Sequence, residues 1–589
     1  MSRPLGLAEA NSLRPSTRTV WPPLEIEEHP IDDYTPIRAV VVGAGISGIT
    51  AGTLLPAKVP ALDLVIYERG SDIGGVWHAN TYPGVRCDVP AHAYQATFAP
   101  STSWSEAYAQ GPEILNYWRE IADKYDVRKY VRLEHKVISA EWSDEKAKWL
   151  IHVSSRDGDF VDEADFLLTA TGHFADPKLP DYPGMDKFQG DIFHTSAWKT
   201  SFEPKDKNIA VIGNGASGIQ VLPQLQKVAR RIDHYARNPT WVAAPIGGEK
   251  LEEYVAEGIE KARLSPENYL EFRKGLENKL FSRFGSIFKG SDKNATTREG
   301  IEKLMASRLV GKPELVKQMI PEFSPSCRRL TPGPGYLEAL TADNVAYITE
   351  GIAEFTEKGI RSSDGTVREA DAVVCSTGHD ITFSSQFPVL CRGKDLQSSW
   401  RPGGSPGFPD SYLGMAAPGF PNFLTLVGPN STGPAGTLCH SVEIQVTYCA
   451  KVLRKAVTQG IRSLEPTQAA TDDFRAYCES FFPRTVMSED CSSWYNGGIK
   501  GGRIHGIWPG SGGHVAIVRQ EPRWEDFKFT YHNAQQNRFG WLGNGWTAKD
   551  VLTSGPGDDY GVDLTPWLRP EALDHAVDLR GYHEQWWIH

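Results

Sequence analysis

Several features that would set this chain apart from ordinary globular enzymes are missing from its sequence. No stretch approaches the roughly 18 uncharged apolar residues of a membrane-spanning helix, so no membrane span is expected. The net charge of −11 arises without a long run of one sign, which argues against nucleic acid as a partner. Residues 1–35 lack a basic segment followed by an apolar one, so a soluble, cytoplasmic protein is expected.

The eight cysteines include no Cys-x-x-Cys pair. A dithiol redox centre and a zinc knuckle both depend on such a pair, so neither is expected and no metal site is predicted. The absence also argues against flavin disulfide reductases, which bind two dinucleotides but need a paired thiol.

Two glycine turns organise what is present. Each follows a short apolar segment, 39–42 or 208–212, and each precedes a segment predicted to be a helix. The glycines are Gly43, Gly45 and Gly48 in the first turn and Gly213, Gly215 and Gly218 in the second. This strand, turn and helix context is the one in which G-x-G-x-x-G binds a pyrophosphate. One such turn is weak evidence, but two predict an α/β fold with two Rossmann-like dinucleotide-binding domains.

The residue that ends the next strand distinguishes the two predicted nucleotides. Glu68 ends the first of these strands, and its carboxylate can accept hydrogen bonds from both ribose hydroxyls while repelling a 2′-phosphate. Arg237 and Asn238 occupy the corresponding region of the second unit, where a cation favours a 2′-phosphate. The first site is therefore predicted to hold FAD and the second NADPH. The alternatives are a glutamate and an arginine that merely face solvent.

A near-repeat marks the predicted domain boundaries. Residues 165–173, DFLLTATGH, and 371–379, DAVVCSTGH, are apolar strands that each leave through Thr-Gly-His. Each is expected to carry the chain across a domain junction. The predicted organisation is an N-terminal arm (1–36), the first part of the FAD-binding domain (37–183), an NADP-binding domain (184–370) with a helical insertion (247–320), the second part of the FAD-binding domain (371–535) and an aromatic-rich C-terminal extension (536–589).

Two helix starts are predicted inside the insertion. Ser265 precedes Pro266, the pattern of an N-cap with proline in the first turn. Thr296 and Glu299 match a capping box. The apolar stripe between them is interpreted as core in preference to a wall for an apolar substrate.

Two irregular segments are rich in aromatic and charged residues. The first is the loop 71–94, and the second is the pair Arg328 and Arg329 before a Pro/Gly segment. Such loops are more often sites than spacers. Core packing for the aromatic residues, and surface ion pairs or unpaired arginines for the charged ones, are the alternatives.

Together these motifs resemble those of the class B flavoprotein monooxygenases, most of all the type I Baeyer–Villiger monooxygenases. The signature F-x-G-x-x-x-H-x-x-x-W is matched by Phe188, Gly190, His194 and Trp198, and Lys199 stands where the family has Pro or Asp. A second pattern, G-x-W-x-x-x-x-[FY]-P-G-x-x-x-D, is met by Gly75, Trp77, Tyr82, Pro83, Gly84 and Asp88. The resemblance covers approximately residues 30–530, and segment 327–340 is similar to fungal members that oxidise large polycyclic or polyketide ketones.

The resemblance implies a reaction. NADPH reduces FAD, the reduced flavin and O2 form a C4a-peroxide, and the peroxide inserts one oxygen atom beside a ketone carbonyl to give an ester or lactone. Oxygenation of an amine or sulfide, and a non-oxygenating NADPH-dependent role, remain alternatives. The expected partners are an apolar ketone and O2, and the sequence does not decide the oligomeric state.

The resemblance also implies roles for residues. Arg329 is implied as the catalytic arginine, and Asp88 as the aspartate that holds it. The FAD site is implied to include the first glycine turn with Glu68, Gly75, Val76, Trp77, His78, Asp88 and Tyr94. The NADP site is implied to include Arg86, Cys87, Asp88, His194, Gly213, Asn214, Gly215, Ala216, Ser217, Gly218, Ile219, Arg237, Asn238, Arg328 and Trp494.

Overall fold

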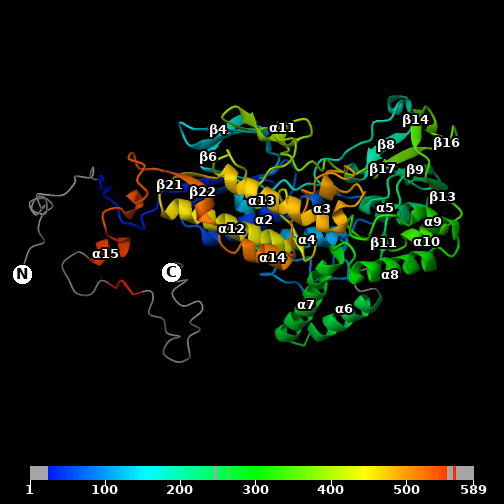
Figure 1. Cartoon of the computed structure of the whole chain (residues 1–589), viewed down its shortest axis with the longest axis horizontal. Helices are drawn as coiled ribbons and strands as arrows, with labels where there is room; N and C mark the ends of the chain where they lie inside the picture. Colours follow the sequence, from blue (N-terminus) through cyan, green and yellow to red (C-terminus); the bar gives the residue numbers. More distant parts are fainter. Residues whose placement is uncertain (1–23, 245–248, 263, 554–560, 566–589) are drawn as a thin grey trace, which may run out of the picture. The chain divides into compact units, whose positions relative to one another are not determined.

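The computed structural model describes residues 24–244, 249–262, 264–553 and 561–565 (Figure 1). Most of the predicted N-terminal arm and the end of the predicted C-terminal extension lie outside these residues. The chain divides into two compact units, one made of residues 36–454 and 463–529 and the other of 1–35, 455–462 and 530–589. No helix of the described part is long and apolar enough to cross a membrane.

The first glycine turn belongs to a five-stranded parallel sheet in the larger unit. Its strands, in the order β20-β7-β1-β2-β3, are β20 (Phe423–Thr425), β7 (Phe166–Thr169), β1 (Ile37–Val42), β2 (Leu62–Tyr67) and β3 (Val131–Arg132). Helix α2 (Ile46–Lys58) connects β1 to β2. The central strands are almost entirely apolar and buried, as expected for a parallel sheet that is covered on both faces.

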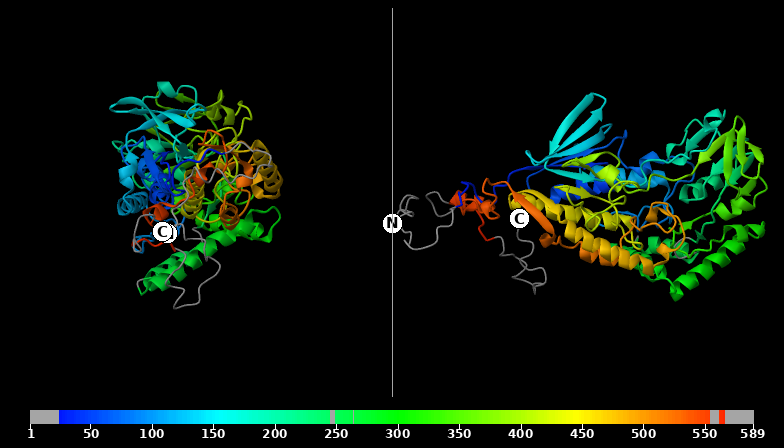
Figure 2. Two further views of the ribbon diagram at one scale, coloured as in Figure 1. Left: turned by 90° about the vertical axis from the view of Figure 1, so that its left-hand side faces the viewer. Right: turned by 45° about the horizontal axis from the view of Figure 1, so that its top comes forward.

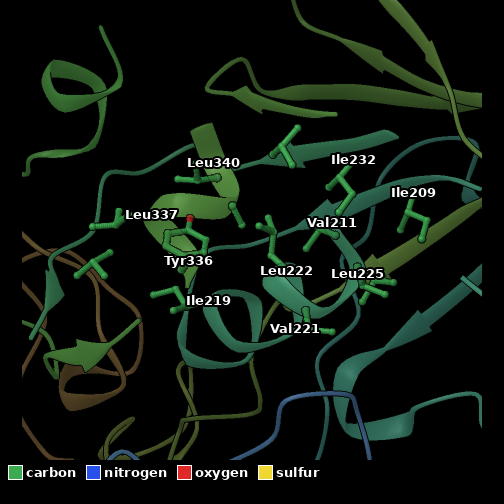
Figure 3. Packing of buried hydrophobic residues seen from close by; sticks show 14 of the residues in the cluster. Ile209, Val211, Ile219, Val221, Leu222, Leu225, Ile232, Tyr336, Leu337 and Leu340 are labelled. Carbon is green, nitrogen blue, oxygen red and sulfur yellow. The ribbon is translucent and has the colours of Figure 1, made fainter. Parts of the chain in front are cut away.

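The second glycine turn belongs to a second parallel sheet. Its strands, in the order β13-β10-β9-β17-β8, are β13 (Val345–Ile348), β10 (Arg231–Tyr235), β9 (Asn208–Ile212), β17 (Ala372–Cys375) and β8 (Asp191–His194). Side chains of α5 (Ala216–Gln226) and α10 (Tyr336–Thr341) pack with those of β9 and β10 in one buried cluster (Figure 3). The predicted α/β fold with two Rossmann-like domains is confirmed.

The second near-repeat corrects one predicted boundary. The chain was expected to return to the first domain at residue 371, but β17 pairs with β9 in the second sheet, just as β7 pairs with β1 in the first. The return therefore follows Cys375. The physical reason is that a buried sheet needs an apolar strand beside its central one, and the run 372–375 supplies it.

The segments that follow the two near-repeats lie side by side. Lys178 donates a backbone hydrogen bond to Gly378 over 2.9 Å, and Asp380 donates one to Asp176 over 3.0 Å. The chain therefore leaves the first domain and re-enters it along one hydrogen-bonded crossing.

The predicted helical insertion is present and consists of α6 (Glu249–Ala262), α7 (Pro266–Phe281), α8 (Asp292–Arg308) and α9 (Glu314–Met319). Ser265 caps α7 as expected, because its side chain accepts from the N–H of Asn268. The capping box predicted at Thr296 is wrong, since α8 begins earlier and Ser291 is its cap. Strands β11 (Val242–Ala243) and β12 (Thr331–Pro332) pair where the chain enters and leaves the insertion.

A third sheet contains strands from both parts of the first domain. It consists of β4 (Lys136–Ser143), β5 (Lys148–Ser155), β6 (Gly158–Ala164), β18 (Val389–Cys391) and β19 (Lys394–Asp395). Strands β4 to β6 form the cyan layer of Figure 2. The remaining elements are α3 (Val76–Ala79), α4 (Gly111–Lys124), α11 (Leu396–Trp400), α12 (Leu438–Thr458), α13 (Gln468–Phe481), α14 (Gly512–Val518), α15 (Ala548–Thr553), β14 (Ile352–Thr356), β15 (Gly359–Ser362), β16 (Val367–Glu369), β21 (Ile461–Pro466) and β22 (Phe527–Tyr531).

Two glycines of the second turn give a matched test of this packing. A Cβ at Gly218 would lie 2.1 Å from the carbonyl oxygen of Gly213, whereas a Cβ at Gly215 would meet nothing within 4 Å. We expect Gly218→Ala to cost roughly 1–3 kcal/mol, since backbone must move, and to lower the thermal midpoint by roughly 2–10 °C. Gly215→Ala should leave the midpoint of the nucleotide-free protein nearly unchanged. Equal losses in the two variants would contradict the described turn.

Candidate functional site

The N-termini of α2 and α5 have the same features, and both suit an anion. Their N-caps, Gly45 and Gly215, provide no side-chain cap, and neither helix has an acidic residue in its first turn. The unpaired N–H groups and the helix dipole at such an end favour a phosphate. The space in front of Gly215 would admit one, because a Cβ there has no neighbour within 4 Å. Both turns thus fit the pyrophosphate of a dinucleotide.

Glu68 lies beside the first turn. One carboxylate oxygen accepts from the N–H of Ala44 over 2.8 Å, and the other accepts from the N–H of Gly70 over 2.7 Å. A carboxylate has about four acceptor positions, so two remain for the ribose hydroxyls. The geometry fits the predicted role, and Glu68 is not the freely solvated side chain of the alternative.

Asn214 and the segment after β10 lie together beside the second turn. The side-chain amide of Asn214 donates to the carbonyl oxygen of Asn238 over 2.8 Å. Arg237, next to Asn238, is exposed. Ala216, Ser217 and Ile219 form the first turn of α5. An exposed guanidinium next to a helix N-terminus fits a nucleotide with a 2′-phosphate.

The loop after the first strand–helix–strand unit is attached to the turn by a backbone hydrogen bond, and two of its aromatic residues pack together. Gly74 donates a backbone hydrogen bond to Ala44, which places α3, with Val76 and His78, next to the turn. The indole N–H of Trp77 donates to the hydroxyl of Tyr94 over 3.3 Å, and the two rings meet edge to face. Burial raises the pKa of Tyr94, so its hydroxyl stays protonated.

The same loop also contacts the second domain. The hydroxyl of Tyr82 donates to the side chain of Gln220 in α5 over 2.8 Å, and Gln220 donates to the carbonyl oxygen of Arg86 over 3.0 Å. The guanidinium of Arg86 lies 3.3 Å from Glu106, so the ion pair named as the alternative for Arg86 is present. Cys87 is buried in the next position. The loop therefore links the two nucleotide turns.

Arg329 and Asp88 form a bidentate pair at the end of this loop. The Nε and Nη2 atoms of Arg329 donate to the two carboxylate oxygens of Asp88 over 2.6 and 2.7 Å. The charge of Asp88 raises the pKa of Arg329, although desolvation opposes it. Desolvation raises the pKa of Asp88, but the Arg329 charge and hydrogen bonds outweigh it and the net pKa is lowered. Both groups are thus permanently charged.

The side chain of Arg329 is about half open to solvent. Its side chain is 48% exposed, against 19% for Asp88. Arg328 lies in a different environment, with its guanidinium 4.9 Å from the ring centre of Phe323. Of the two adjacent arginines, only Arg329 combines a fixed carboxylate partner with a face open to a ligand.

Arg283 lies near the Arg329–Asp88 pair, and it is a candidate site residue that no sequence motif indicates. It lies in a short 3-10 helix (Ser282–Ile287) after α7. Burial and the nearby charge of Arg329 lower the pKa of Arg283. Tyr495 and Asp88 act in the opposite direction, but by less. The insertion therefore places a second guanidinium close enough to Arg329 and Asp88 to interact with their charges. No motif precedes Arg283, and only the folded chain shows its position.

Trp494 lies in an aromatic stack at the domain crossing. Its ring is 5.1 Å from that of His173 and 6.3 Å from that of Phe383, and both are nearly parallel to it. His173 ends the first near-repeat. Trp494 was predicted as an NADP-site residue, and no sequence motif indicates its histidine partner.

His194 and His379 face each other on the other side of the crossing, with ring centres 5.4 Å apart. The N–H of Ser196 donates to Nδ1 of His194 over 3.1 Å, and the hydroxyl of Ser196 lies 2.9 Å from Nε2 of His379. Burial lowers the pKa of His194, and it lowers the pKa of His173 and of His379 to about 4. All three are neutral at pH 7. The repeated Thr-Gly-His was the signal for His173 and His379, but it was interpreted only as a crossing.

Comparisons with known proteins agree with this geometry. A family model described as flavin-binding monooxygenase-like matches residues 37–252. The FAD-binding monooxygenase moxY of Dothistroma septosporum is 32% identical over 91% of this chain and 86% of its own length. A Baeyer-Villiger monooxygenase of Streptomyces coelicolor is 31% identical over 83% of this chain and 91% of its own length. The chain belongs to this family of flavin-binding monooxygenases.

Solved structures of the family extend the likeness to the whole fold. A steroid monooxygenase bound to NADP is 26% identical, with a TM-score of 0.69 over 84% of this chain and 99% of that one. Cyclohexanone monooxygenase from Rhodococcus sp. Phi1 bound to NADP+ is also 26% identical, with a TM-score of 0.70 over 84% of this chain and 99% of that one. The resemblance to type I Baeyer–Villiger monooxygenases is confirmed. FAD and NADPH are the cofactors of this monooxygenase.

The depressed histidine pKa values predict a pH dependence of stability. In the unfolded chain His173 and His379 take up protons near pH 6.5, but in the folded protein only near pH 4. The contribution of these two histidines to the free energy of unfolding is therefore fully present above pH 6.5, and it is lost as the pH falls towards 4. His379→Gln should make this loss smaller, as seen in thermal midpoints measured between pH 7 and 4.5. His152→Gln, at an exposed position of β5, is the control, and an unchanged slope in His379→Gln would contradict a neutral, half-buried His379.

Proposed function

We propose that this monooxygenase is a Baeyer–Villiger enzyme. It inserts one oxygen atom of O2 beside the carbonyl of a large cyclic or polycyclic ketone and forms an ester or lactone. The observation that carries this proposal is the half-exposed side chain of Arg329, whose guanidinium is held by Asp88 in the loop that contacts both nucleotide-binding domains. Support also comes from a relative named a Baeyer-Villiger monooxygenase and from the likeness to cyclohexanone and steroid monooxygenases.

In the proposed arrangement each cofactor has its own turn. The first glycine turn, Glu68 and the aromatic loop at 75–94 hold FAD. The second turn, Arg237 and Asn238 hold NADPH, and Trp494 packs against its nicotinamide ribose. When bound, FAD supplies the activation of O2 and NADPH supplies the hydride. The protein has to orient these groups, exclude water and set the charge of the site.

Arg329 sets that charge. A guanidinium cannot act as an acid or base at physiological pH, so its part is electrostatic. At about 4 Å and an effective dielectric near 20, it would favour a negatively charged oxygen by roughly 4 kcal/mol. Asp88 fixes its orientation through both carboxylate oxygens. Such a fixed cation suits attack on a carbonyl carbon, because negative charge then develops on oxygen.

Oxygenation of an amine or sulfide is the second candidate function. It would use the same cofactors, but it has no need of a cation that favours negatively charged oxygen. The Arg329–Asp88 pair therefore favours the ketone, and a comparison of products from ketones and sulfides separates the two reactions.

Removal of the guanidinium tests the proposal. We expect Arg329→Ala to bind FAD normally and to form ester roughly 100- to 1,000-fold more slowly, since about 4 kcal/mol of stabilisation is lost. Arg329→Lys keeps the charge but loses the bidentate geometry, so an intermediate rate is expected. Product is measured by mass spectrometry as the gain of one oxygen atom by cyclic and polycyclic ketones. If Arg329→Ala forms ester at the wild-type rate, Arg329 has no part in catalysis.

The choice between NADPH and NADH tests the second site. Arg237→Ala should raise the KM for NADPH roughly 10- to 100-fold, because a charge-assisted hydrogen bond to phosphate contributes about 1.5–3 kcal/mol. The KM for NADH, which has no 2′-phosphate, should change little. Arg230→Ala removes an exposed arginine of the same domain and serves as the control. Similar effects on both coenzymes would argue against a 2′-phosphate contact at Arg237.

A further inference from the structure

A disulfide links two segments of the candidate site that are far apart in the sequence. Cys327 and Cys491 are bonded across 164 residues, and both are fully buried. Cys327 lies two residues before Arg329, and Cys491 lies three before Trp494. The bond therefore joins the chain that carries the catalytic guanidinium to the chain that carries the aromatic stack.

A second contact lies beside the disulfide. The backbone N–H and the hydroxyl of Ser324 donate to the two carboxylate oxygens of Glu489 over 2.6 and 2.9 Å. Segment 324–327 is thus attached to segment 489–491 at both of its ends, once by a charge-assisted pair of hydrogen bonds and once covalently.

The Cys491 side is in turn fixed to the Trp494 turn. The side-chain amide of Asn496 donates to the carbonyl oxygen of Cys491 over 2.9 Å, and the N–H of Ser493 donates to the side-chain oxygen of Asn496 over 2.9 Å. Tyr495, in the same turn, is buried; burial raises its pKa, and the charges of Arg329 and Asp88 lower and raise it in turn by less. A continuous set of bonds therefore runs from the Trp494 turn through the disulfide to the chain next to Arg329.

Arg329 depends on this attachment, because its own segment is irregular. Beyond Arg329 the chain runs into the two-residue strand β12 and the Pro/Gly turn before α10. A segment with little regular hydrogen bonding opens locally at small cost. A cross-link to a fixed neighbour raises that cost.

We propose that Cys327 and Cys491 are positioning residues for Arg329. Their disulfide holds the guanidinium at the distance from the flavin that oxygen transfer needs, and its reduction leaves FAD bound but lets NADPH be consumed without product. This inference rests on the proposed function of Arg329. In the reduction, a dithiol gives two electrons and two protons, the sulfur–sulfur bond breaks, two thiols form, and the dithiol closes to its own disulfide.

The test compares oxidised enzyme, enzyme reduced with dithiothreitol, and the Cys327→Ser/Cys491→Ser variant. Mass spectrometry of a non-reducing digest should find the 327–491 linked peptide in the oxidised enzyme, and its absence would overturn the proposal. The ratio of ester formed to NADPH consumed should fall roughly tenfold or more on reduction and in the variant, because small displacements of an oriented group are costly. FAD content and NADPH consumption should stay within a few-fold.

Cys478→Ser provides the control. Cys478 is a free cysteine, buried in the same apolar cluster as Tyr495. This variant should couple NADPH to product as the wild type does and should respond to dithiothreitol in the same way, whereas the double variant should not respond. Equal coupling in the oxidised enzyme, the reduced enzyme and the double variant would overturn the positioning role.

Hydrogen exchange gives a readout that does not depend on activity. On reduction, amides of 324–330 and 489–497 should exchange faster, while those of 37–48 at the first glycine turn should not change. Unchanged exchange in the first two segments would overturn the proposal. If the oxidised enzyme oxygenates no ketone, the proposed function fails, and the exchange result still decides whether the disulfide fixes the Arg329 segment.

Discussion

The bidentate pair of Arg329 and Asp88 is the interaction on which the candidate site depends. Its partners come from the loop after the first glycine turn and from the segment that leaves the helical insertion. Asp88 is only 19% exposed, so the pair has to offset the desolvation of this carboxylate, and it does so only with good geometry. Here both carboxylate oxygens are used, and the contact of Tyr82 and Arg86 with Gln220 holds the Asp88 loop against α5. The orientation of one side chain thus depends on the packing of two domains.

The histidines of the domain crossing add no positive charge to the candidate site at pH 7. His173, His194 and His379 line the domain crossing, and burial lowers the pKa of each, so that all are neutral at pH 7. Cations near a bound nicotinamide or flavin would compete with Arg329 for negative charge. Arg283 adds to the positive charge near Arg329, and burial together with the Arg329 charge lowers its pKa.

The parts of the site that the sequence predicted are those set by short-range chemistry. Glycine spacing, Glu68 at a strand end and Ser265 before Pro266 are local patterns, and each reflects a steric or hydrogen-bonding need of its own segment. The boundary at 371 failed because pairing of β17 with β9 is a long-range contact. The capping box at Thr296 failed because its residues are also tolerated within a helix. Arg283 and the partner of Cys491 have no local signal at all.

The spacing of the cysteines along the sequence does not predict the disulfide between Cys327 and Cys491. The lack of Cys-x-x-Cys bears only on a dithiol centre formed by neighbouring residues, whereas a disulfide depends on the distance between two Cα atoms in space, which is 6.4 Å for Cys327 and Cys491. The charge of an arginine is guaranteed by its chemistry, but its position is not. Because the electrostatic effect falls with distance, the chain has to fix where the guanidinium lies, and a covalent link two residues away restricts that position more strongly than the irregular segment could alone.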